Sequence, residues 1–259
     1  MAPDSTPDIR IVLVEPSHPG NIGAVARAMM NMELTQLVLV RPREFPHPEA
    51  TARAAGAESV LAAARVVDTV QEAIADCGFV VATTSRDRDQ NFRVLDVRDA
   101  AVRAVAEARR APVALLFGAE RTGLRNEDLE ATHVLLRIPA GREYASLNLA
   151  MAVQLVSYEI FRARGAPGSA GAKRTHDAAV PLATPPQMQG LYEHLEAVLQ
   201  EVNFKDRTRA GTHLMSRIRR FLQRAELDQN EANILRGILT AIQNRRRTAS
   251  SAQPPKPQS

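Results

Sequence analysis

Three stretches of the sequence place glycines and small polar residues directly after strand-like runs. They are Gly20-Asn21-Ile22-Gly23, which Arg27 follows one helical turn later, then Leu115–Leu124 and Arg137–Gln154. Glycines let a backbone approach a ligand closely, and loops at the carboxyl ends of parallel strands can converge on one ligand. We therefore expect a single binding site built from three segments that are distant in the sequence.

Each stretch taken alone also has an ordinary structural explanation. The first stretch is typical of a tight strand-to-helix turn. Ser146 is a residue type typical of a helix N-cap, and Asn148 suits the first turn of a helix. Arg27 suits a solvated surface position as well as a place at the mouth of a site. Only the combination of the three stretches favours a functional interpretation.

Several common kinds of site are not supported by the sequence. It contains no G-x-G-x-x-G, no Walker lysine and no G-x-S-x-G elbow, and its six histidines lack the spacing of metal ligands. Cys77 is the single cysteine, which excludes an internal disulfide and a cysteine-based zinc site. We expect no metal at the site.

Strand-like runs alternate with helical patterns, which predicts an α/β fold with a parallel sheet covered on both faces. The strand-like runs are Ile9–Glu15, Leu37–Arg41, Arg65–Val67, Phe79–Thr83, Val113–Phe117 and Val134–Ile138. The helical patterns are Ala24–Asn31, Pro48–Ala55, Val70–Ala75, Asp99–Arg109 and Leu147–Arg164. The last pattern is apolar on more than one face, so we expect it in the core or in a subunit interface.

Composition divides the chain into a body and a smaller end. Residues 1–164 form the predicted α/β domain, and residues 165–187, rich in Gly, Pro, Ala and Ser, are typical of a flexible linker. Residues 188–247 contain three amphipathic helical patterns, which predict a small helical bundle. The Pro-, Gln- and Ser-rich tail 248–259 is predicted to be disordered.

Positive charge is concentrated in the C-terminal helical patterns. Residues 187–247 hold 11 Lys and Arg against 7 Asp and Glu, whereas residues 1–186 hold 21 against 22. Arg217, Arg220 and Arg224 lie largely off the apolar stripe of the second pattern. A neutral body with a basic end indicates that the end meets a polyanion.

A further charged segment, residues 85–93, follows the run Phe79–Thr83. Its three arginines, Arg86, Arg88 and Arg93, are offset by Asp87 and Asp89. A solvated loop is the default interpretation, and contact with phosphate is the alternative.

The sequence also bears on location. Its first residues, MAPDSTPD, form no basic and apolar leader. No apolar run approaches the roughly 20 residues that a membrane helix needs. We expect a soluble cytoplasmic protein without a membrane partner.

Taken together, the three stretches resemble the motifs of the SPOUT class of RNA methyltransferases, on the TrmH-like branch that methylates ribose. The matching segments are NIGAVARAM, LLFGAERTGL and IPAGREYASLNLAMAVQ, in that order. The run from Leu191 to Arg245 is similar to the helical extension of the TrmJ subfamily of tRNA (cytidine/uridine-2′-O-)-methyltransferases. The resemblance implies a parallel sheet with a deep trefoil knot, a homodimer, and an enzyme that acts on tRNA.

The resemblance also implies the residues of the site. S-adenosylmethionine would be held in the knot by Thr83, Thr84, Ser85, Gly118, Ile138, Ala145, Ser146, Leu147 and Asn148. Arg27 would position the ribose hydroxyl or a phosphate and favour the alkoxide. Asn21 would orient Arg27 or the ribose.

For the substrate, the resemblance implies the ribose at position 32 of the tRNA anticodon loop. The residues expected to contact tRNA are Arg86, Arg88, Tyr144, Arg217, Arg220 and Arg224. Two alternatives stay open at this point: a 2′-O-methyltransferase that acts on rRNA, and a catalytically silent RNA-binding protein of the same fold. The C-terminal bundle could also serve only dimerisation or protein docking.

Overall fold

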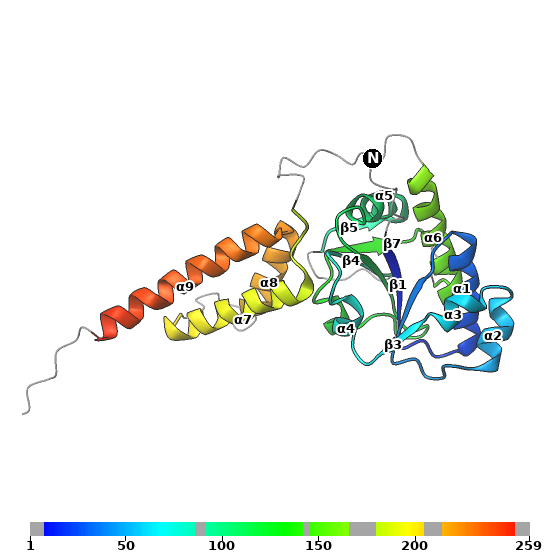
Figure 1. The fold of residues 1–259 in the computed structure, drawn as a ribbon, viewed down its shortest axis with the longest axis horizontal. Coiled ribbons are helices and arrows are strands. Elements are labelled where there is room, and N and C mark those ends of the chain that lie inside the picture. The colour runs from blue at the N-terminus through cyan, green and yellow to red at the C-terminus, as the bar shows by residue number, and fades with distance from the viewer. Residues whose placement is uncertain (1–7, 86–91, 142–145, 166–179, 205–213, 252–259) are drawn as a thin grey trace, which may run out of the picture.

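A seven-stranded sheet forms the centre of the computed structural model, which describes residues 8–85, 92–141, 146–165, 180–204 and 214–251. The strand order is β3-β2-β1-β6-β4-β7-β5, and every pair of neighbours is parallel (Figure 1). The strands are β1 (Ile9–Val14), β2 (Gln36–Val40), β3 (Arg65–Val67), β4 (Phe79–Thr83), β5 (Val94–Asp96), β6 (Val113–Phe117) and β7 (Val134–Arg137). The predicted parallel α/β sheet is confirmed.

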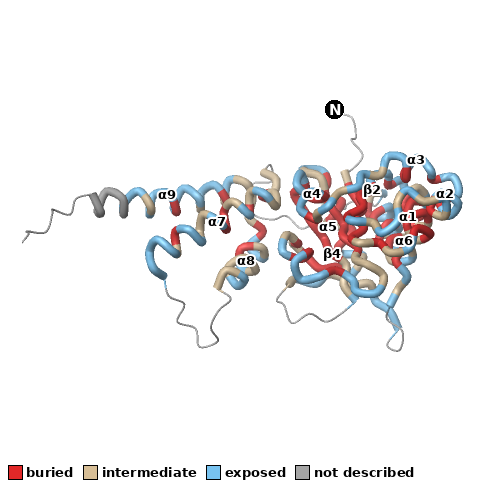
Figure 2. The backbone as a smooth tube through the Cα atoms, turned by 90° about the horizontal axis from the view of Figure 1, so that it is seen from below, coloured by how far each residue is buried: buried red, intermediate tan, exposed pale blue. Residues whose placement is uncertain are grey.

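Helices cover both faces of this sheet. They are α1 (Pro19–Asn31), α2 (Pro48–Ala54), α3 (Glu58–Ala62), α4 (Val70–Ile74), α5 (Val97–Glu107) and α6 (Leu149–Gly165). Successive strand residues point to opposite faces, so Ile11 packs in the cluster that includes Val153 of α6, whereas Val12 packs with Ile74 of α4. Figure 2 shows that buried residues are concentrated in the sheet and in the helices that pack on it.

The first glycine-rich stretch is helical rather than a loop. Pro19 occupies the first position of α1, which favours proline, and His18 Nδ1 accepts a hydrogen bond from the Gly20 N–H at 3.2 Å. A Cβ on Gly23 would lie 2.0 Å from the carbonyl oxygen of Ala50 in α2. The prediction of a turn here is wrong, because Gly23 is required by close packing of two helices and not by a change of chain direction.

Two short elements are not predicted by the sequence patterns. Strand β5 has three residues and lies at the edge of the sheet beyond β7. Helix α3 has five residues and follows α2 after a short turn. Both are short, and β5 is largely exposed at the sheet edge, so neither has a clear run of buried apolar residues.

The C-terminal part contains three helices that extend from the α/β body (Figure 1). They are α7 (Pro185–Glu201), α8 (Leu214–Ala225) and α9 (Gln229–Ser251). Their shared core includes Leu191, Val198, Leu222 and Leu239. No helix in the described part of the chain has both the length and the apolar character needed to cross a membrane.

The boundaries of this part differ somewhat from those expected. Helix α7 begins at Pro185, inside the range expected to be a linker, and the Gln187 side chain caps it by accepting a hydrogen bond from the Thr184 N–H at 2.8 Å. Helix α9 continues to Ser251, which is past the expected start of the tail. Residues 166–179 and 252–259 lie outside the described residues.

The knot implied by the resemblance stays a prediction. The chain near the third motif would have to thread a loop, and residues 142–145 of that motif lie outside the described residues. Parallel strands covered by helices are common to knotted and unknotted α/β domains alike.

A buried arginine ties β1 to the segment that leads into β4. Arg10 is 7% exposed, and its guanidinium contacts both carboxylate oxygens of Asp76, with Nη1–Oδ1 at 2.7 Å and Nη2–Oδ2 at 2.8 Å. Nη1 also donates to the Ala73 carbonyl at 2.8 Å. The hydrogen bond from Arg10 holds the pKa of Asp76 below its ordinary value, although partial burial acts in the opposite direction.

We expect Asp76→Asn to lower the free energy of unfolding by about 1.5 kcal/mol at neutral pH, because it leaves a buried guanidinium without its charged partner. The pKa of Asp76 is lower in the folded than in the unfolded state, so this stabilisation is present above about pH 4 and is lost as the pH falls further. Urea unfolding at neutral pH and at about pH 3 should therefore show a difference between variant and wild type that is smaller in acid.

Asp68→Asn is the matched control, since Arg41 contacts Asp68 through its backbone carbonyl and not its carboxylate. A destabilisation by Asp76→Asn that is the same at both pH values would contradict this account.

Candidate functional site

A pocket of about 300 Å³ lies where the chain leaves the carboxyl ends of β4, β6 and β7. Its walls come from residues 83–85 after β4, residues 117–124 after β6, the end of β7, and the start of α6. Strand β4 lies between β6 and β7, so loops that are far apart in the sequence become neighbours. The second and third predicted stretches therefore meet at one place.

Most residues expected to hold a cofactor line this pocket. They are Thr83, Thr84, Ser85, Gly118, Ile138, Ser146 and Leu147. Asn148 follows them on the chain, and its side-chain oxygen caps α6 by accepting a hydrogen bond from the Ala150 N–H at 2.9 Å. Ala145 lies outside the described residues.

Gly118 allows the loop after β6 to fold back on itself. A Cβ at this position would lie 2.2 Å from the backbone of Gly123 and Leu124. An isolated β-bridge between Ala119 and Gly123 closes the loop, and Gly123 has a φ of 67°, which residues with a Cβ rarely adopt. The pocket wall is thus made of backbone as much as of side chains.

The lining of the pocket is mixed, with more polar than apolar surface, and it includes hydroxyls and the charged Glu120 and Arg121. Leu136 and Leu149 contribute apolar surface, and Thr84 adds a hydroxyl. Thr83 Oγ1 donates to the Leu116 carbonyl at 3.0 Å and so joins β4 to β6. Such a lining fits a planar heterocycle with a short polar chain, which are the groups that S-adenosylmethionine presents.

Glu120 connects all three predicted stretches, although no motif in the sequence singles it out. Its carboxylate accepts hydrogen bonds from the Ser17 N–H at 2.9 Å, the Ser17 hydroxyl at 2.8 Å, the His18 N–H at 3.4 Å and Asn21 Nδ2 at 2.8 Å. Asn21 Oδ1 in turn accepts from Asn148 Nδ2 at 3.0 Å. This network therefore runs from the β1–α1 corner through the second loop to the start of α6.

The environment of Glu120 favours its ionised form. Burial acts to raise its pKa, but the hydrogen bonds from Asn21 and Ser17 together outweigh burial and hold the pKa below its ordinary value. The side chain is therefore a permanent acceptor at neutral pH. Its position two residues after Gly118 is the one signal in the sequence that could have pointed to it.

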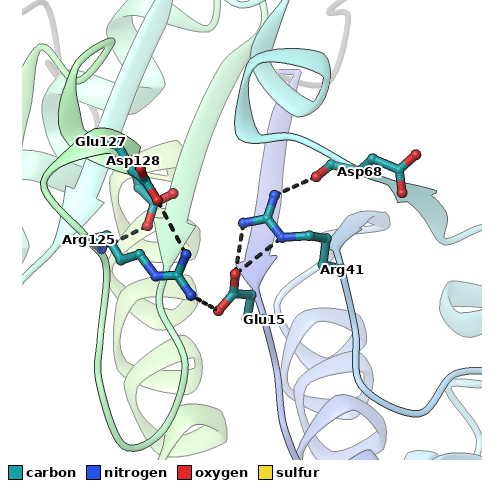
Figure 3. Close-up of polar contacts among 6 residues, drawn as sticks. All are labelled: Glu15, Arg41, Asp68, Arg125, Glu127 and Asp128. Carbon is teal, nitrogen blue, oxygen red and sulfur yellow. Dashed lines mark hydrogen bonds and ion pairs between the residues drawn. The ribbon is translucent and has the colours of Figure 1, made fainter.

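Glu15 holds the far end of the loop that follows β6 through its contact with Arg125. It follows β1 and accepts hydrogen bonds from Arg125 Nη2 at 2.9 Å and from Arg41 Nη2 at 2.8 Å (Figure 3). Arg41 also donates to the Asp68 carbonyl, and the Asp128 carboxylate accepts from the Arg125 backbone N–H at 2.7 Å. Glu15 and Arg41 have φ values of 51° and 45°, which are unfavourable for residues with a Cβ, so these contacts hold two strand ends in an uncommon conformation.

The two residues expected to act on the ribose are placed differently. Asn21 is part of the hydrogen-bond network beside the pocket. Arg27 is exposed on α1 and does not line the pocket of its own chain. Within the described residues Arg27 forms no side-chain hydrogen bond or ion pair, so its guanidinium is available to a molecule outside the chain.

Of the arginines expected to contact RNA, those that the structure describes do not line the pocket. Arg217 and Arg224 are exposed on α8, and Arg220 on the same helix is partly buried. The remaining residues expected to contact tRNA lie outside the described residues: Arg86, Arg88 and Tyr144.

A larger cavity, the possible metal ligands and the single cysteine do not indicate a second reactive site in the part of the chain that the structure describes. A cavity of about 580 Å³ lies between the α/β body and the C-terminal helices, with Met188 and Leu222 in its wall, but no carboxyl end of a strand opens into it, unlike the usual ligand sites of parallel sheets. The described residues contain no group of His, Cys, Asp and Glu arranged to hold a metal ion. Burial raises the pKa of the Cys77 thiol to about 12, so it is not a nucleophile at neutral pH.

Comparison with known proteins agrees with this geometry. Residues 8–158 match the SpoU rRNA Methylase family, and residues 186–253 match the family described as tRNA methyltransferase TrmJ, C-terminal domain. A protein of Photorhabdus laumondii named tRNA (cytidine/uridine-2′-O-)-methyltransferase TrmJ is 45% identical over 236 residues, which cover 91% of this chain and 97% of that protein.

Two solved structures extend the comparison to the fold. TrmJ from Z. mobilis ZM4 has a TM-score of 0.76 and 34% identity, covering 92% of this chain and 100% of that chain. A probable methylase family protein from Haemophilus influenzae has a TM-score of 0.59 and 39% identity, covering 93% and 98% of the two chains. The chain therefore belongs to the SpoU methylase family and carries the C-terminal domain typical of the TrmJ group.

Proposed function

We propose that this protein is an S-adenosylmethionine-dependent enzyme that methylates the ribose 2′-hydroxyl of tRNA at position 32 of the anticodon loop. The main support is the pocket that the second and third segments form together, with the first segment joined to it through the Glu120 network. The name of the Photorhabdus relative, which the chain matches over nearly its whole length, supports tRNA as the substrate. A tRNA substrate also supports the cytoplasmic location expected from the sequence.

In this proposal the pocket holds the cofactor. S-adenosylmethionine, when bound, supplies an already activated methyl group. Thr83, Thr84, Ser85, Gly118, Ile138, Ala145, Ser146, Leu147 and Asn148 would surround it. Backbone groups around Gly118 suit this task, since they need no ordering of rotamers when the ligand arrives.

The protein itself has to align the ribose hydroxyl and favour loss of its proton. Arg27 suits this role, because its exposed guanidinium is unpaired within the described part of the chain and would stabilise negative charge on the ribose oxygen. A guanidinium is a poor base, so Arg27 would position and stabilise rather than accept the proton. Asn21, held by Glu120 and Asn148, would orient the ribose or Arg27.

The C-terminal helices would bind the tRNA backbone. Arg217 and Arg224 are exposed on α8, Arg220 lies on the same helix, and phosphate contacts dominate the affinity of proteins for nucleic acids. Arg86, Arg88 and Tyr144 would add contacts closer to the ribose.

A homodimer is the proposed functional unit. Helix α6 exposes Met151, Leu155, Tyr158 and Phe161, with exposed fractions of 62%, 42%, 46% and 42%. These positions are three or four residues apart and therefore lie along one side of the helix. A continuous apolar stripe on a soluble domain favours an interface, and the second copy of the chain is the partner we propose.

Incubation of purified protein with unmodified tRNA and labelled cofactor, followed by mapping of 2′-O-methyl groups, tests the function. We expect one modified nucleotide at position 32 and none in rRNA. Arg27→Ala should reduce turnover by about 100-fold or more, because it removes a charge that stabilises the developing alkoxide.

Arg98→Ala, an exposed arginine on α5, is the matched control and should turn over normally. Modification of rRNA alone would overturn the substrate assignment, and near-normal turnover of Arg27→Ala would overturn the role of that residue.

Glu120→Gln should weaken cofactor binding about tenfold in calorimetry, because it leaves donors without an acceptor. Both oxygens of Glu120 receive N–H or O–H donors, so the amide of a glutamine would turn a donor toward a donor. Glu127→Gln is the control, since Glu127 is exposed and its side chain contacts Arg125 alone among the described hydrogen bonds. An unchanged dissociation constant for Glu120→Gln would show that the network does not shape the pocket.

Leu155→Glu should convert the protein to monomers in sedimentation velocity and abolish turnover, because it places a charge in the proposed apolar interface. Ile234→Glu changes an apolar residue that is 61% exposed on α9 and should leave the mass unchanged. A wild-type protein that sediments as a monomer would refute the proposed dimer.

A further inference from the structure

One buried ion pair joins the α/β body to the C-terminal helices. Arg103 lies on α5, and Glu226 directly follows α8. Arg103 Nη1 is 2.6 Å from Glu226 Oε1, a close ionic contact whose angle is not that of a hydrogen bond, and the two side chains are 15% and 6% exposed. Removing either charge would take from the other its nearest opposite charge in a largely buried place.

Arg103 is held in place on the side of the body. Its guanidinium lies 4.6 Å from the centre of the Phe79 ring, where β4 begins, and Nη2 is 4.0 Å from the Glu107 carboxylate. A cation over an aromatic face is attracted by the ring. Arg103 therefore has a defined position relative to the sheet before the C-terminal helices make contact with it.

The backbone of Glu226 is also held in a constrained conformation. Its φ is 52°, in the left-handed region that glycine usually occupies after a helix. This conformation turns the chain from α8 toward α9 and is unfavourable for a residue with a Cβ. A glutamate at this position is explained by the contact of its carboxylate with Arg103, not by local preference.

The other contacts described between the two parts are a solvent-exposed ion pair and an apolar contact. Arg219 of α8 lies 3.3 Å from the Glu130 carboxylate, but Glu130 is 58% exposed, so solvent screens this pair. Leu182, which precedes α7, adds an apolar contact, because it is buried in the core cluster of the body and is 8% exposed. A cavity of about 580 Å³ lies between the body and the helices, so the two parts are not closely packed there.

We propose that the Arg103–Glu226 pair fixes the orientation of α8 on the body and thereby positions bound tRNA for the pocket. The two residues are positioning residues, since neither touches the pocket. Glu226 follows the helix that carries Arg217, Arg220 and Arg224, so its anchor sets where those arginines lie relative to the site. The consequence for tRNA rests on the proposed function, whereas the orientation itself does not.

Single-molecule energy transfer between dyes at Ala62→Cys on α3 and Ala241→Cys on α9 measures the orientation directly. Both positions are exposed, and the native Cys77 is buried and stays unlabelled. We expect one narrow distribution for the otherwise unchanged full-length chain and a broad one for Glu226→Gln. In steady-state assays Glu226→Gln should raise the KM for tRNA about tenfold, because a loosely held second module contributes less to binding, with the cofactor affinity unchanged.

Glu226→Asp, which keeps the negative charge on a shorter side chain, should give a narrower distribution and a lower KM than Glu226→Gln, which distinguishes the ion pair from general damage to the fold. Arg109→Met and Glu196→Gln, exposed residues on the two parts, should have no effect. A narrow distribution in Glu226→Gln would overturn the proposal, and so would a broadened one with an unchanged KM for tRNA. If the unaltered protein does not act on tRNA at all, the proposed function fails, while the energy-transfer result still decides whether the pair sets the orientation.

Discussion

The carboxylate of Glu120 is the interaction on which the architecture of the site depends. An ionised carboxylate only accepts hydrogen bonds, so every atom around it has to be a donor, and Ser17, His18 and Asn21 supply those donors from the β1–α1 corner. Asn21 extends the network to Asn148 at the start of α6. One side chain thereby sets the relative position of three segments, and the wall of the pocket is in place before any ligand binds.

Close approach of backbones is the second constraint on the site. Gly118 lets the loop after β6 fold against its own backbone, and Gly23 lets α1 lie against α2. Glu15 then holds the far end of the loop through Arg125. Its contact with Arg41 also stabilises the positive φ angles of Glu15 and Arg41, the residues that follow β1 and β2. The loop is thus held at its start by the missing Cβ of Gly118, next by the ionised Glu120, and at its far end by the Glu15–Arg125 pair.

The two parts of the chain differ in charge. The α/β body is close to neutral and contains the pocket, whereas the C-terminal helices carry the excess of arginine. A basic surface attracts RNA over several ångströms but does not orient it. Orientation requires a fixed relation between the parts, and a buried ion pair suits this purpose because its energy depends strongly on geometry.

The sequence by itself determined the central strands, because buried parallel strands are short apolar runs, whereas the residues proposed to hold the cofactor came from the resemblance of the motifs. The resemblance of the three stretches to known motifs supplied the family. Only the tertiary structure decided that Gly23 lies within a helix, that β5 extends the sheet, and that Glu120 and Glu226 are held in ionic or hydrogen-bonded contacts. The physical reason is that partners from distant segments decide whether a carboxylate is buried or solvated. Asn21, for example, is 99 residues from Glu120 in the sequence. No local sequence pattern specifies such partners.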